Sequence, residues 1–270
     1  MNPGVRELPI LRCAANSSAV SQVDAVSVEE PIEFRIGGEA ISITMRTPGH
    51  DDELAAGFLL TEGMIQSRSQ ILEIAPCPQP AAGSVLNLFL TPEVVVSSAA
   101  FSRQLLSNSS CGICGKSSME SIYNRFPPVQ SAIKLAAAIL SDLPNKLAAA
   151  QQQFSQTGGL HAAALFNPEG SLLVLREDIG RHNAVDKVIG WALFNLPLPL
   201  SSSILMVSGR VSFEIVAKAV AAGVPVVASI SAPSTLAIEL AIGNEVTLAG
   251  FVRGQSFNLY SRPDRLTGIT

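Results

Sequence analysis

The second half of the 270-residue chain alternates short apolar runs with helix-like stretches, and this alternation limits the possible folds more than any other feature. Apolar runs cover residues 203–208, 225–230 and 246–252, and apolar residues at helical spacing lie between them in 212–222 and 234–242. Strands separated by single helices are typical of βαβ units, in which the strands run parallel in one sheet. We therefore expect an α/β fold here.

The composition agrees with a layered, well-packed protein. Hydrophobic residues make up 47% of the chain, charged residues 15% and aromatic residues only 5%, so the core has to be built from Ala, Val, Ile and Leu. The net charge of −4 argues against a nucleic-acid-binding protein. We find no signal peptide and no apolar run long enough for a membrane span, so we expect a cytoplasmic protein with reduced thiols.

Three regions are expected along the chain. Residues 1–22 show no clear period and are expected to form a flexible tail. Residues 23–130 are expected to form a smaller β-rich domain, with a hairpin over 28–45 and one helix, and to end in a Cys-containing loop and its helix. Residues 131–270 are expected to form the α/β domain.

Prolines set the expected helix ends in the middle of the chain. Residues 116–126 are expected to form a helix that ends at Pro127-Pro128, and residues 131–143 one that stops before Pro144. A further helix is expected over residues 145–157, before Gly158-Gly159.

The pair Cys111-Gly112-Ile113-Cys114 is the strongest candidate for chemistry. Such a pair can supply half of a metal site, carry thiol or persulfide chemistry, or form a disulfide. The helix expected after it and the nearby Lys116 would both lower a thiol pKa, which favours the reactive thiolate. A nucleophilic thiol with a second thiol beside it can accept sulfur and be resolved by its neighbour.

Zinc chemistry is the main alternative for this pair. His161 could complete a three-ligand zinc site like that of zinc deaminases, but the position two residues later holds Ala163 instead of the Glu that moves protons. A structural zinc site would need a second Cys pair. His50-Asp51-Asp52 could also bind a metal, although an acidic helix start explains it better. We therefore expect no resident metal.

Polar loops between strands and helices are the candidate binding segments. Ser208-Gly209-Arg210 precedes a helix and offers a hydroxyl group, a free N–H and a guanidinium, which suits a phosphate. Ser231-Ala232-Pro233-Ser234 is placed in the same way, although a helix cap explains Ser208 and Ser234 equally well. The polar loop over residues 176–183 adds His182 as a ligand candidate.

Together these features resemble the FdhD family of formate dehydrogenase accessory proteins. Four stretches carry the resemblance: residues 47–58 (TPGHDDELAAGF), 111–115 (CGICG), 176–187 (REDIGRHNAVDK), and Ser208-Gly209-Arg210 with Phe213-Glu214. It extends from about residue 25 to the end of the chain.

The resemblance implies a sulfurtransferase whose Cys111 carries a persulfide. The sulfur donor would be a cysteine desulfurase. The acceptor would be the molybdenum cofactor in its bis-molybdopterin guanine dinucleotide form, before that cofactor enters formate dehydrogenase. We infer from its spacing that Cys114 assists release. The family's cofactor-binding segment, including the contact to guanine, matches Phe251, Val252, Arg253, Gly254, Gln255 and Ser256, to which we add Arg210 and His182.

The resemblance also implies a cytidine-deaminase-like three-layer core with a mixed, mostly parallel sheet, and a homodimer. Two alternatives of a different class stay open. One is a chaperone that binds the cofactor and docks on the dehydrogenase without transferring sulfur. The other is a zinc-binding, deaminase-like protein.

Overall fold

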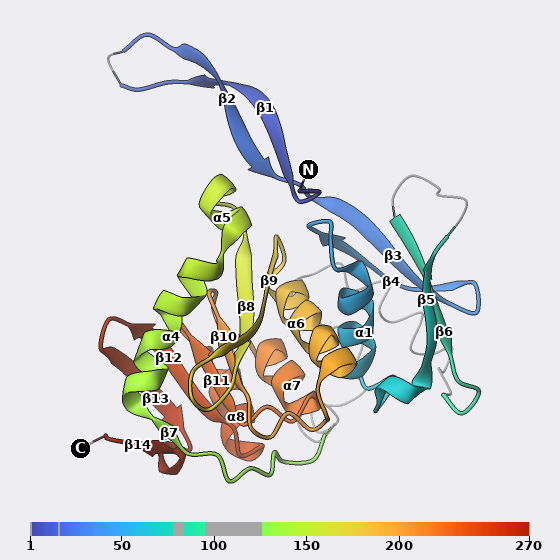
Figure 1. The fold of residues 1–270 in the computed structure, drawn as a ribbon, viewed down its shortest axis with the longest axis vertical. Helices are drawn as coiled ribbons and strands as arrows, with labels where there is room; N and C mark the ends of the chain where they lie inside the picture. Colours follow the sequence, from blue (N-terminus) through green and yellow to red (C-terminus); the bar gives the residue numbers. More distant parts are fainter. Residues whose placement is uncertain (1, 16, 78–83, 95–125, 270) are drawn as a thin grey trace.

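The computed structural model describes residues 2–15, 17–77, 84–94 and 126–269, and a six-stranded sheet forms its centre (Figure 1). The strand order is β13-β12-β11-β10-β8-β9. The strands are β8 (His161–Phe166), β9 (Leu172–Asp178), β10 (Ile204–Val207), β11 (Val226–Ser229), β12 (Thr247–Arg253) and β13 (Ser256–Ser261). Every residue of β10 and β11 is buried, because helices cover both faces of the sheet.

The sheet is mixed, but the expectation that it is mostly parallel is wrong. β10 pairs parallel with β11, and β11 with β12. The other pairings, β8 with β10, β8 with β9 and β12 with β13, are antiparallel. The reason is local, since tight turns join β8 to β9 and β12 to β13, and a strand that follows a tight turn runs back beside its predecessor. The parallel βαβ part is limited to the three strands of the predicted alternation.

Helices on the two faces of the sheet form two apolar clusters. The helix α4 (Ala137–Ala150) packs Leu140, Leu143 and Leu147 on one face. The opposite face is covered by α6 (Arg181–Asn195), α7 (Phe213–Ala221) and α8 (Thr235–Gly243). The result is a three-layer arrangement, and Figure 1 shows α4 and α6 on opposite sides of the strands.

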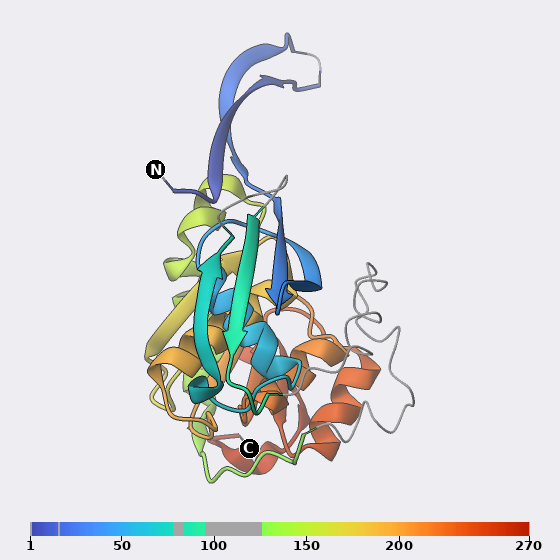
Figure 2. The same ribbon diagram turned by 90° about the vertical axis from the view of Figure 1, so that its right-hand side faces the viewer.

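The N-terminal part adds a second sheet and one helix beside these layers (Figure 2). The sheet has the order β4-β3-β6-β5, formed by β3 (Glu30–Ile36), β4 (Glu39–Arg46), β5 (Ile71–Pro76) and β6 (Ser84–Leu90). The predicted hairpin is β3–β4, and the predicted helix is α1 (Asp51–Thr61). A short 3₁₀ turn, η1 (Arg68–Gln70), leads into β5.

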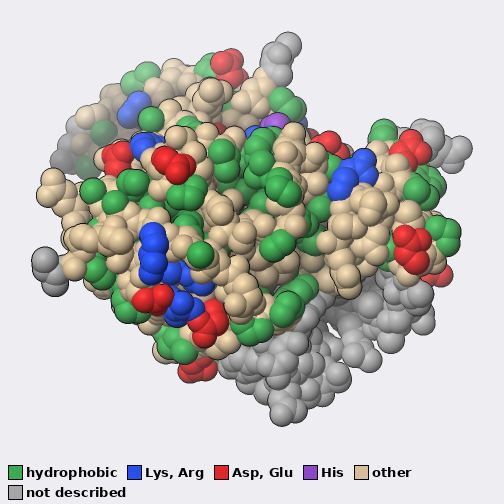
Figure 3. Space-filling view, turned by 60° about the horizontal axis from the view of Figure 1, so that its bottom comes forward, with side chains coloured by type: hydrophobic (Ala, Val, Ile, Leu, Met, Phe, Trp, Pro, Cys, Tyr) green, Lys and Arg blue, Asp and Glu red, His purple; other side chains and the backbone are tan. Residues whose placement is uncertain are grey.

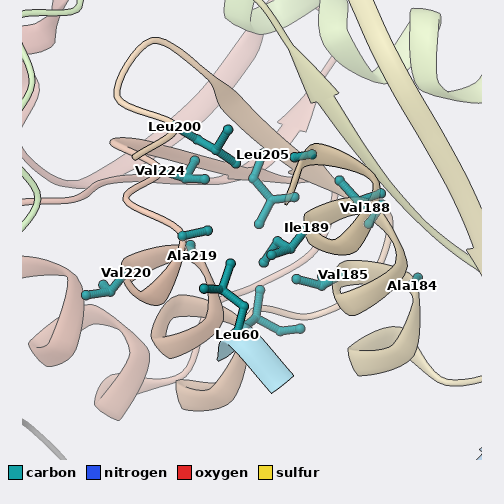
Figure 4. Packing of buried hydrophobic residues seen from close by; sticks show 14 of the residues in the cluster. Leu60, Ala184, Val185, Val188, Ile189, Leu200, Leu205, Ala219, Val220 and Val224 are labelled. Carbon is teal, nitrogen blue, oxygen red and sulfur yellow. The ribbon is translucent and has the colours of Figure 1, made fainter. Parts of the chain in front are cut away.

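The helix α1 packs closely on α6, and glycines make the contact possible. A Cβ on Gly57 would overlap the carbonyl oxygen of Asp186, and one on Gly190 would overlap that of Glu53. Figure 4 shows Leu60 of α1 beside side chains of α6 and α7. One apolar cluster therefore runs from the N-terminal sheet into the α/β part, and the domain boundary at residue 130 stays a prediction.

Two expectations about the remaining elements are wrong. Instead of a flexible tail, β1 (Val5–Arg12) and β2 (Val20–Ser27) pair as an antiparallel hairpin, and both faces of this hairpin carry apolar as well as polar side chains. Pro144 lies inside α4 instead of ending a helix, because its neighbours Leu143 and Leu147 are anchored in the core. A separate short helix, α5 (Gln152–Thr157), follows.

Small elements at the end of the chain complete the described structure. After β13 a 3₁₀ turn, η2 (Pro263–Arg265), leads to β14 (Leu266–Thr267), which pairs in parallel with β7 (Leu135–Ala136). The space-filling view in Figure 3 shows Lys and Arg side chains close to acidic ones on this side of the molecule. The predicted helix over residues 116–126 lies outside the described residues, except for Phe126.

Candidate functional site

Polar residues from several elements meet at the edge of the central sheet where β10, β11 and β12 end. Ser208-Gly209-Arg210 follows β10 directly. β8 runs antiparallel to β10, so its first residue, His161, lies at the same edge. The Ser208 hydroxyl accepts a hydrogen bond from the backbone N–H of Ala162 at 2.9 Å, and the Ser208 N–H donates to the Ala162 carbonyl at 2.9 Å. Ser208 therefore joins the two strands and does not cap a helix.

Gly209 lets side chains from two other elements approach this loop. A Cβ at this position would lie 3.0 Å from Nδ1 of His161 and 3.8 Å from Cδ of Arg181. The Gly209 carbonyl accepts a hydrogen bond from the Ser229 hydroxyl at 2.7 Å, which fixes the loop to the end of β11. The backbone of Gly209 is thus held against His161 and Arg181.

The buried carboxylate of Asp178 positions the loop that carries Arg181 and His182. Both side chains of the pair Asp178–Lys187 are excluded from solvent, and their charged atoms are 2.7 Å apart. The carboxylate also accepts hydrogen bonds from the backbone N–H groups of Thr47 (3.1 Å) and Gly180 (2.8 Å) and from Nδ2 of Asn183 (3.1 Å). The start of α6 is therefore held in place.

The turn between β4 and α1 is tied to the same loop. Thr47 accepts a hydrogen bond from the Ile179 N–H on its hydroxyl and one from Nζ of Lys187 on its carbonyl, at 3.2 and 2.8 Å. Nearby, Glu53 accepts two hydrogen bonds from the guanidinium of Arg176, at 2.5 and 2.7 Å. Burial raises the pKa of Glu53, but the bonds from Arg176 and His50 outweigh it and leave that pKa below its usual value.

His182 lies in a polar contact with the start of α7. Its Nε2 is 3.2 Å from the Ser212 hydroxyl and 3.7 Å from a carboxylate oxygen of Glu214. Burial alone would raise the pKa of Glu214, but hydrogen bonds from His182, Ser212 and its own backbone lower it to about 2. Glu214 is therefore ionised and fixes the ring of His182 at this edge.

The half-buried imidazole of His161 is close to several cations. Burial lowers its pKa, and the charges of Arg181, His182 and Arg210 lower it further, against an opposing effect of Asp178. His161 is therefore neutral at pH 7, able both to donate and to accept a hydrogen bond.

Two arginines of this edge have no acidic partner among the described residues. Arg210 is exposed, and Nε of Arg181 is buried without a hydrogen-bond acceptor. Guanidinium groups without a carboxylate partner are suited to phosphate or carboxylate ligands. We call His161, Arg181, His182 and Arg210 the basic edge.

The segment Phe251–Ser256 divides between two places. Phe251 lies beside the end of β11, since its N–H donates to the Ser231 carbonyl at 3.1 Å, and Val252 is buried. The guanidinium of Arg253 lies 5.5 Å from the centre of the Phe251 ring, a cation–π contact. The turn beyond it, up to Ser256, is exposed.

The turn after Arg253 borders a hollow on the α4 side of the sheet. The hollow has a volume of about 560 Å³, and Gly254, Gln255 and Phe257 line it from one side. Ser141, Asp142 and Asn145 of α4 line it from the other. Neither Arg210 nor His182 borders this hollow, so the structure does not unite all the predicted cofactor-binding residues in one pocket.

Most of the sequence also matches a known protein family. The model of the FdhD/NarQ family matches residues 27–267. The chain belongs to the FdhD/NarQ family.

Proteins named sulfur carrier protein FdhD resemble this FdhD/NarQ chain over nearly their full length. The protein of Mycolicibacterium paratuberculosis is 49% identical over 255 residues, 92% of this chain and 94% of the relative. The protein of Thermoplasma volcanium is 45% identical over 254 residues, 90% of this chain and 89% of the relative. The crystal structure of a proposed formate dehydrogenase accessory protein from Desulfotalea psychrophila has a TM-score of 0.78 at 24% identity, covering 98% of this chain and all of that one, so the fold is shared.

The remaining site predictions for this FdhD/NarQ protein concern the Cys pair, the start of α1 and a possible metal site. Cys111 and Cys114 lie outside the described residues, so their predicted roles stay predictions. The acidic start of α1 is confirmed, because Asp51 pairs with Arg46 and His50 with Glu53. His50 occupies the N-cap position of this helix with a positive φ of 58°. Within residues 2–15, 17–77, 84–94 and 126–269, no three His, Cys, Asp or Glu side chains are arranged for a metal.

The Ser234 hydroxyl accepts a hydrogen bond from the Ala237 N–H at 3.2 Å, so the helix-cap interpretation of Ser234 is confirmed.

In the part of the chain that the structure describes, no helix is both long and apolar enough to cross a membrane.

Sequence reasoning missed the buried charges that support the basic edge. The sequence alone predicts no role for Asp178 and Lys187 beyond their place in the stretch 176–187. For His161 it predicts only a possible zinc ligand. A second buried pair, Lys218 with Asp186, links α7 to α6 at 2.8 Å. The signal available in the sequence was that Lys187 and Lys218 interrupt runs of apolar residues at helical spacing, where a charge needs a buried partner.

Proposed function

We propose that this protein is a sulfur carrier that serves formate dehydrogenase. The support comes from relatives at 45–49% identity, which are named sulfur carrier protein FdhD. The observation on this chain that carries the proposal is the basic edge, where two arginines that have no acidic partner among the described residues lie beside a neutral imidazole. Such an edge suits an anionic ligand, and the chain also carries the Cys111–Cys114 pair.

The proposed chemistry is persulfide transfer by Cys111. A cysteine desulfurase persulfide passes its terminal sulfur to the Cys111 thiolate, which leaves a thiol on the desulfurase and a persulfide on Cys111. Cys114 then attacks Sγ of Cys111, so that the S–S bond of the persulfide breaks, a Cys111–Cys114 disulfide forms, and the terminal sulfur leaves as hydrosulfide for the acceptor. A dithiol reductant returns the disulfide to two thiols before the next cycle. In this scheme the protein acts as a sulfurtransferase.

The proposed acceptor is the bis-molybdopterin guanine dinucleotide form of the molybdenum cofactor, bound as a substrate. Arg210 and His182 contact its phosphates, and the segment Phe251–Ser256 contacts a guanine. The volume of the hollow beside Gly254 and Gln255, about 560 Å³, lies within the range of small-molecule pockets, which supports this assignment. The side chains that line it offer hydrogen-bond donors and acceptors of the kind a purine needs.

The remaining proposals concern fold type, assembly and location. We assign the core to the cytidine-deaminase-like class, supported by three parallel strands beside an antiparallel one that begins at His161. A homodimer is supported by the β1–β2 hairpin, which exposes Leu11, Val20 and Val23. Reduced thiols are required for the chemistry, which places the protein in the cytoplasm with its desulfurase and dehydrogenase partners.

The second candidate function is a cofactor chaperone that transfers no sulfur. The observation in its favour concerns the cysteines that the structure describes, Cys13 and Cys77. Neither of them is part of the basic edge or lines the hollow. Both features would bind an anionic nucleotide in a protein with no reactive thiol.

Mass measurement of sulfur loading separates the two functions. The purified protein is incubated with a cysteine desulfurase and cysteine, and its intact mass is measured with and without a thiol reductant. A reductant-sensitive gain of one sulfur atom that is lost in Cys111→Ser supports the carrier. Cys13→Ser, which removes an exposed thiol on the N-terminal hairpin, is the matched control and should load normally. No gain on folded protein with free thiols would favour the chaperone.

A further inference from the structure

Three basic residues of the edge come from three different elements and lie around one backbone position. His161 begins β8, Arg181 begins α6, and Arg210 follows β10 directly after Gly209. A Cβ on Gly209 would be 3.0 Å from His161 Nδ1 and 3.8 Å from Arg181 Cδ. A side chain at position 209 would crowd the imidazole, so the glycine leaves room for the ring of His161 beside Arg181.

Among the described residues, the carboxylates of Asp178 and Glu214 near this site already have other partners. Asp178 is fully buried and is bonded to Lys187 and to backbone and amide donors. The Glu214 carboxylate is paired with the imidazole of His182. Positive charge therefore remains at Arg181 and Arg210, and the buried Nε of Arg181 has no acceptor among the described residues. A buried donor without an acceptor is costly, and an anion would satisfy it.

The imidazole of His161 is sensitive to what binds there. It faces Arg181 and His182 from α6, Arg210 from the β10–α7 loop and Asp178 from β9. The three basic groups disfavour its protonated form, and Asp178 favours it. An anion that neutralises the arginines would remove this repulsion and add an attraction of its own.

We propose that His161, Arg181 and Arg210 form one oxyanion site that takes up a proton together with a doubly charged phosphate group. The proton comes from solvent and binds to the imidazole, which then donates hydrogen bonds from both ring nitrogens. Anion binding and protonation of His161 strengthen each other by the same factor, so the site binds the phosphate group more tightly as the pH falls, over the range in which that group keeps both of its charges. The proposal rests on the proposed function only for the source of the phosphate, a nucleotide cofactor.

Titration calorimetry with inorganic pyrophosphate tests the site directly. The full chain is titrated in two buffers that differ in their heat of ionisation, so that proton uptake appears as a buffer-dependent heat. We expect saturable binding with net proton uptake at neutral pH. Arg181→Gln and Arg210→Gln should each weaken binding by about tenfold, the loss expected for one charge-assisted hydrogen bond. Binding without proton uptake, or no binding of pyrophosphate, would overturn the proposal.

Two histidine variants assign the proton. His161→Gln keeps a hydrogen-bonding side chain but cannot titrate, so pyrophosphate should bind with no proton uptake and with a flatter pH dependence. His50→Asn removes a histidine that pairs with Glu53 in the turn before α1, and it should bind as the unsubstituted protein does. Unchanged proton uptake in folded His161→Gln would refute the role of this residue.

Further titrations separate the sources of the phosphate and the two proposals. Guanosine diphosphate binding more tightly than pyrophosphate, with guanosine alone weak, identifies a nucleotide as the source, whereas equal affinities identify free pyrophosphate. Cys111→Ser should bind either ligand with full proton uptake although it loads no sulfur. If the unsubstituted protein loads no sulfur but still binds pyrophosphate with proton uptake, the carrier function fails and this inference stands.

Discussion

The carboxylate of Asp178 lies 2.7 Å from the ammonium group of Lys187, and both side chains are shielded from solvent. Asp178 ends β9, and Lys187 lies in the second turn of α6. Between them stand Arg181 and His182, so the pair fixes the geometry of the basic edge without contacting a ligand.

Replacing one member of this pair should be severely destabilising. Asp178→Asn or Lys187→Met leaves a buried charge without its partner and should lower the free energy of unfolding by about 3–5 kcal/mol. Urea denaturation followed by circular dichroism measures the effect. Arg6→Gln, which breaks the exposed pair of Arg6 with Glu30, should cost less than about 1 kcal/mol. Equal losses in the buried and exposed variants would contradict this assignment.

Alanine at Gly57 or Gly190 should separate α1 from α6. Each added Cβ overlaps a backbone carbonyl of the facing helix, which cannot move aside as a flexible side chain would. We expect a loss of about 3 kcal/mol or more in the free energy of unfolding. Gly243→Ala is the matched control, because a Cβ there meets open space at the end of α8 and should be neutral or slightly stabilising. A thermal melt distinguishes these outcomes, and a neutral Gly57→Ala would show that the helices are not packed this closely.

Glu214 should contribute to the acid sensitivity of the fold. Its pKa in the folded protein is about 2, below the value in an unfolded chain, so its stabilising effect is complete above the unfolded pKa and is lost as pH falls towards 2. After allowance for solvent screening we expect about 1–3 kcal/mol from this group. The measurement compares the free energy of unfolding at about pH 6 and about pH 3. Glu214→Gln should show the smaller difference, and an unchanged difference would argue against the His182 contact.

The hollow beside α4 should contribute to nucleotide binding. Gln255→Ala and Asn145→Ala each remove one hydrogen-bonding side chain from its lining, and each should weaken guanosine diphosphate binding by about three- to tenfold. Equilibrium dialysis gives the affinities. Gln152→Ala, at an exposed position of α5, is the control. If neither lining variant differed from it, the hollow would have no part in binding the nucleotide.

The predictable part of this fold is the part governed by local pattern. Local pattern predicted three strands and two helices, because each of these elements buries its own regular face. The apolar runs correspond to β10, β11 and β12, and the periodic stretches correspond to α7 and α8. Ser208-Gly209-Arg210 was readable for the same reason, since it follows a recognisable strand.

What could not be predicted depends on contacts between distant segments. Pro144 is tolerated inside α4 only because the core holds the flanking leucines. The contact of Lys187 with Thr47 joins residues 140 positions apart, and no local pattern specifies it. The direction of β8 in the sheet, which brings His161 to the basic edge, is likewise a matter of topology and not of periodicity.

The bond from Lys187 to Thr47 has a consequence for dissecting the chain. A fragment limited to residues 131–270 would contain all four residues of the basic edge, yet it would lack the backbone groups that Asp178 and Lys187 bind in the turn before α1. Such a fragment would also expose the face of α6 around Gly190 on which α1 packs. The basic edge thus depends on the intact polypeptide, and the N-terminal segment serves as a built-in scaffold for four side chains that all belong to the C-terminal half.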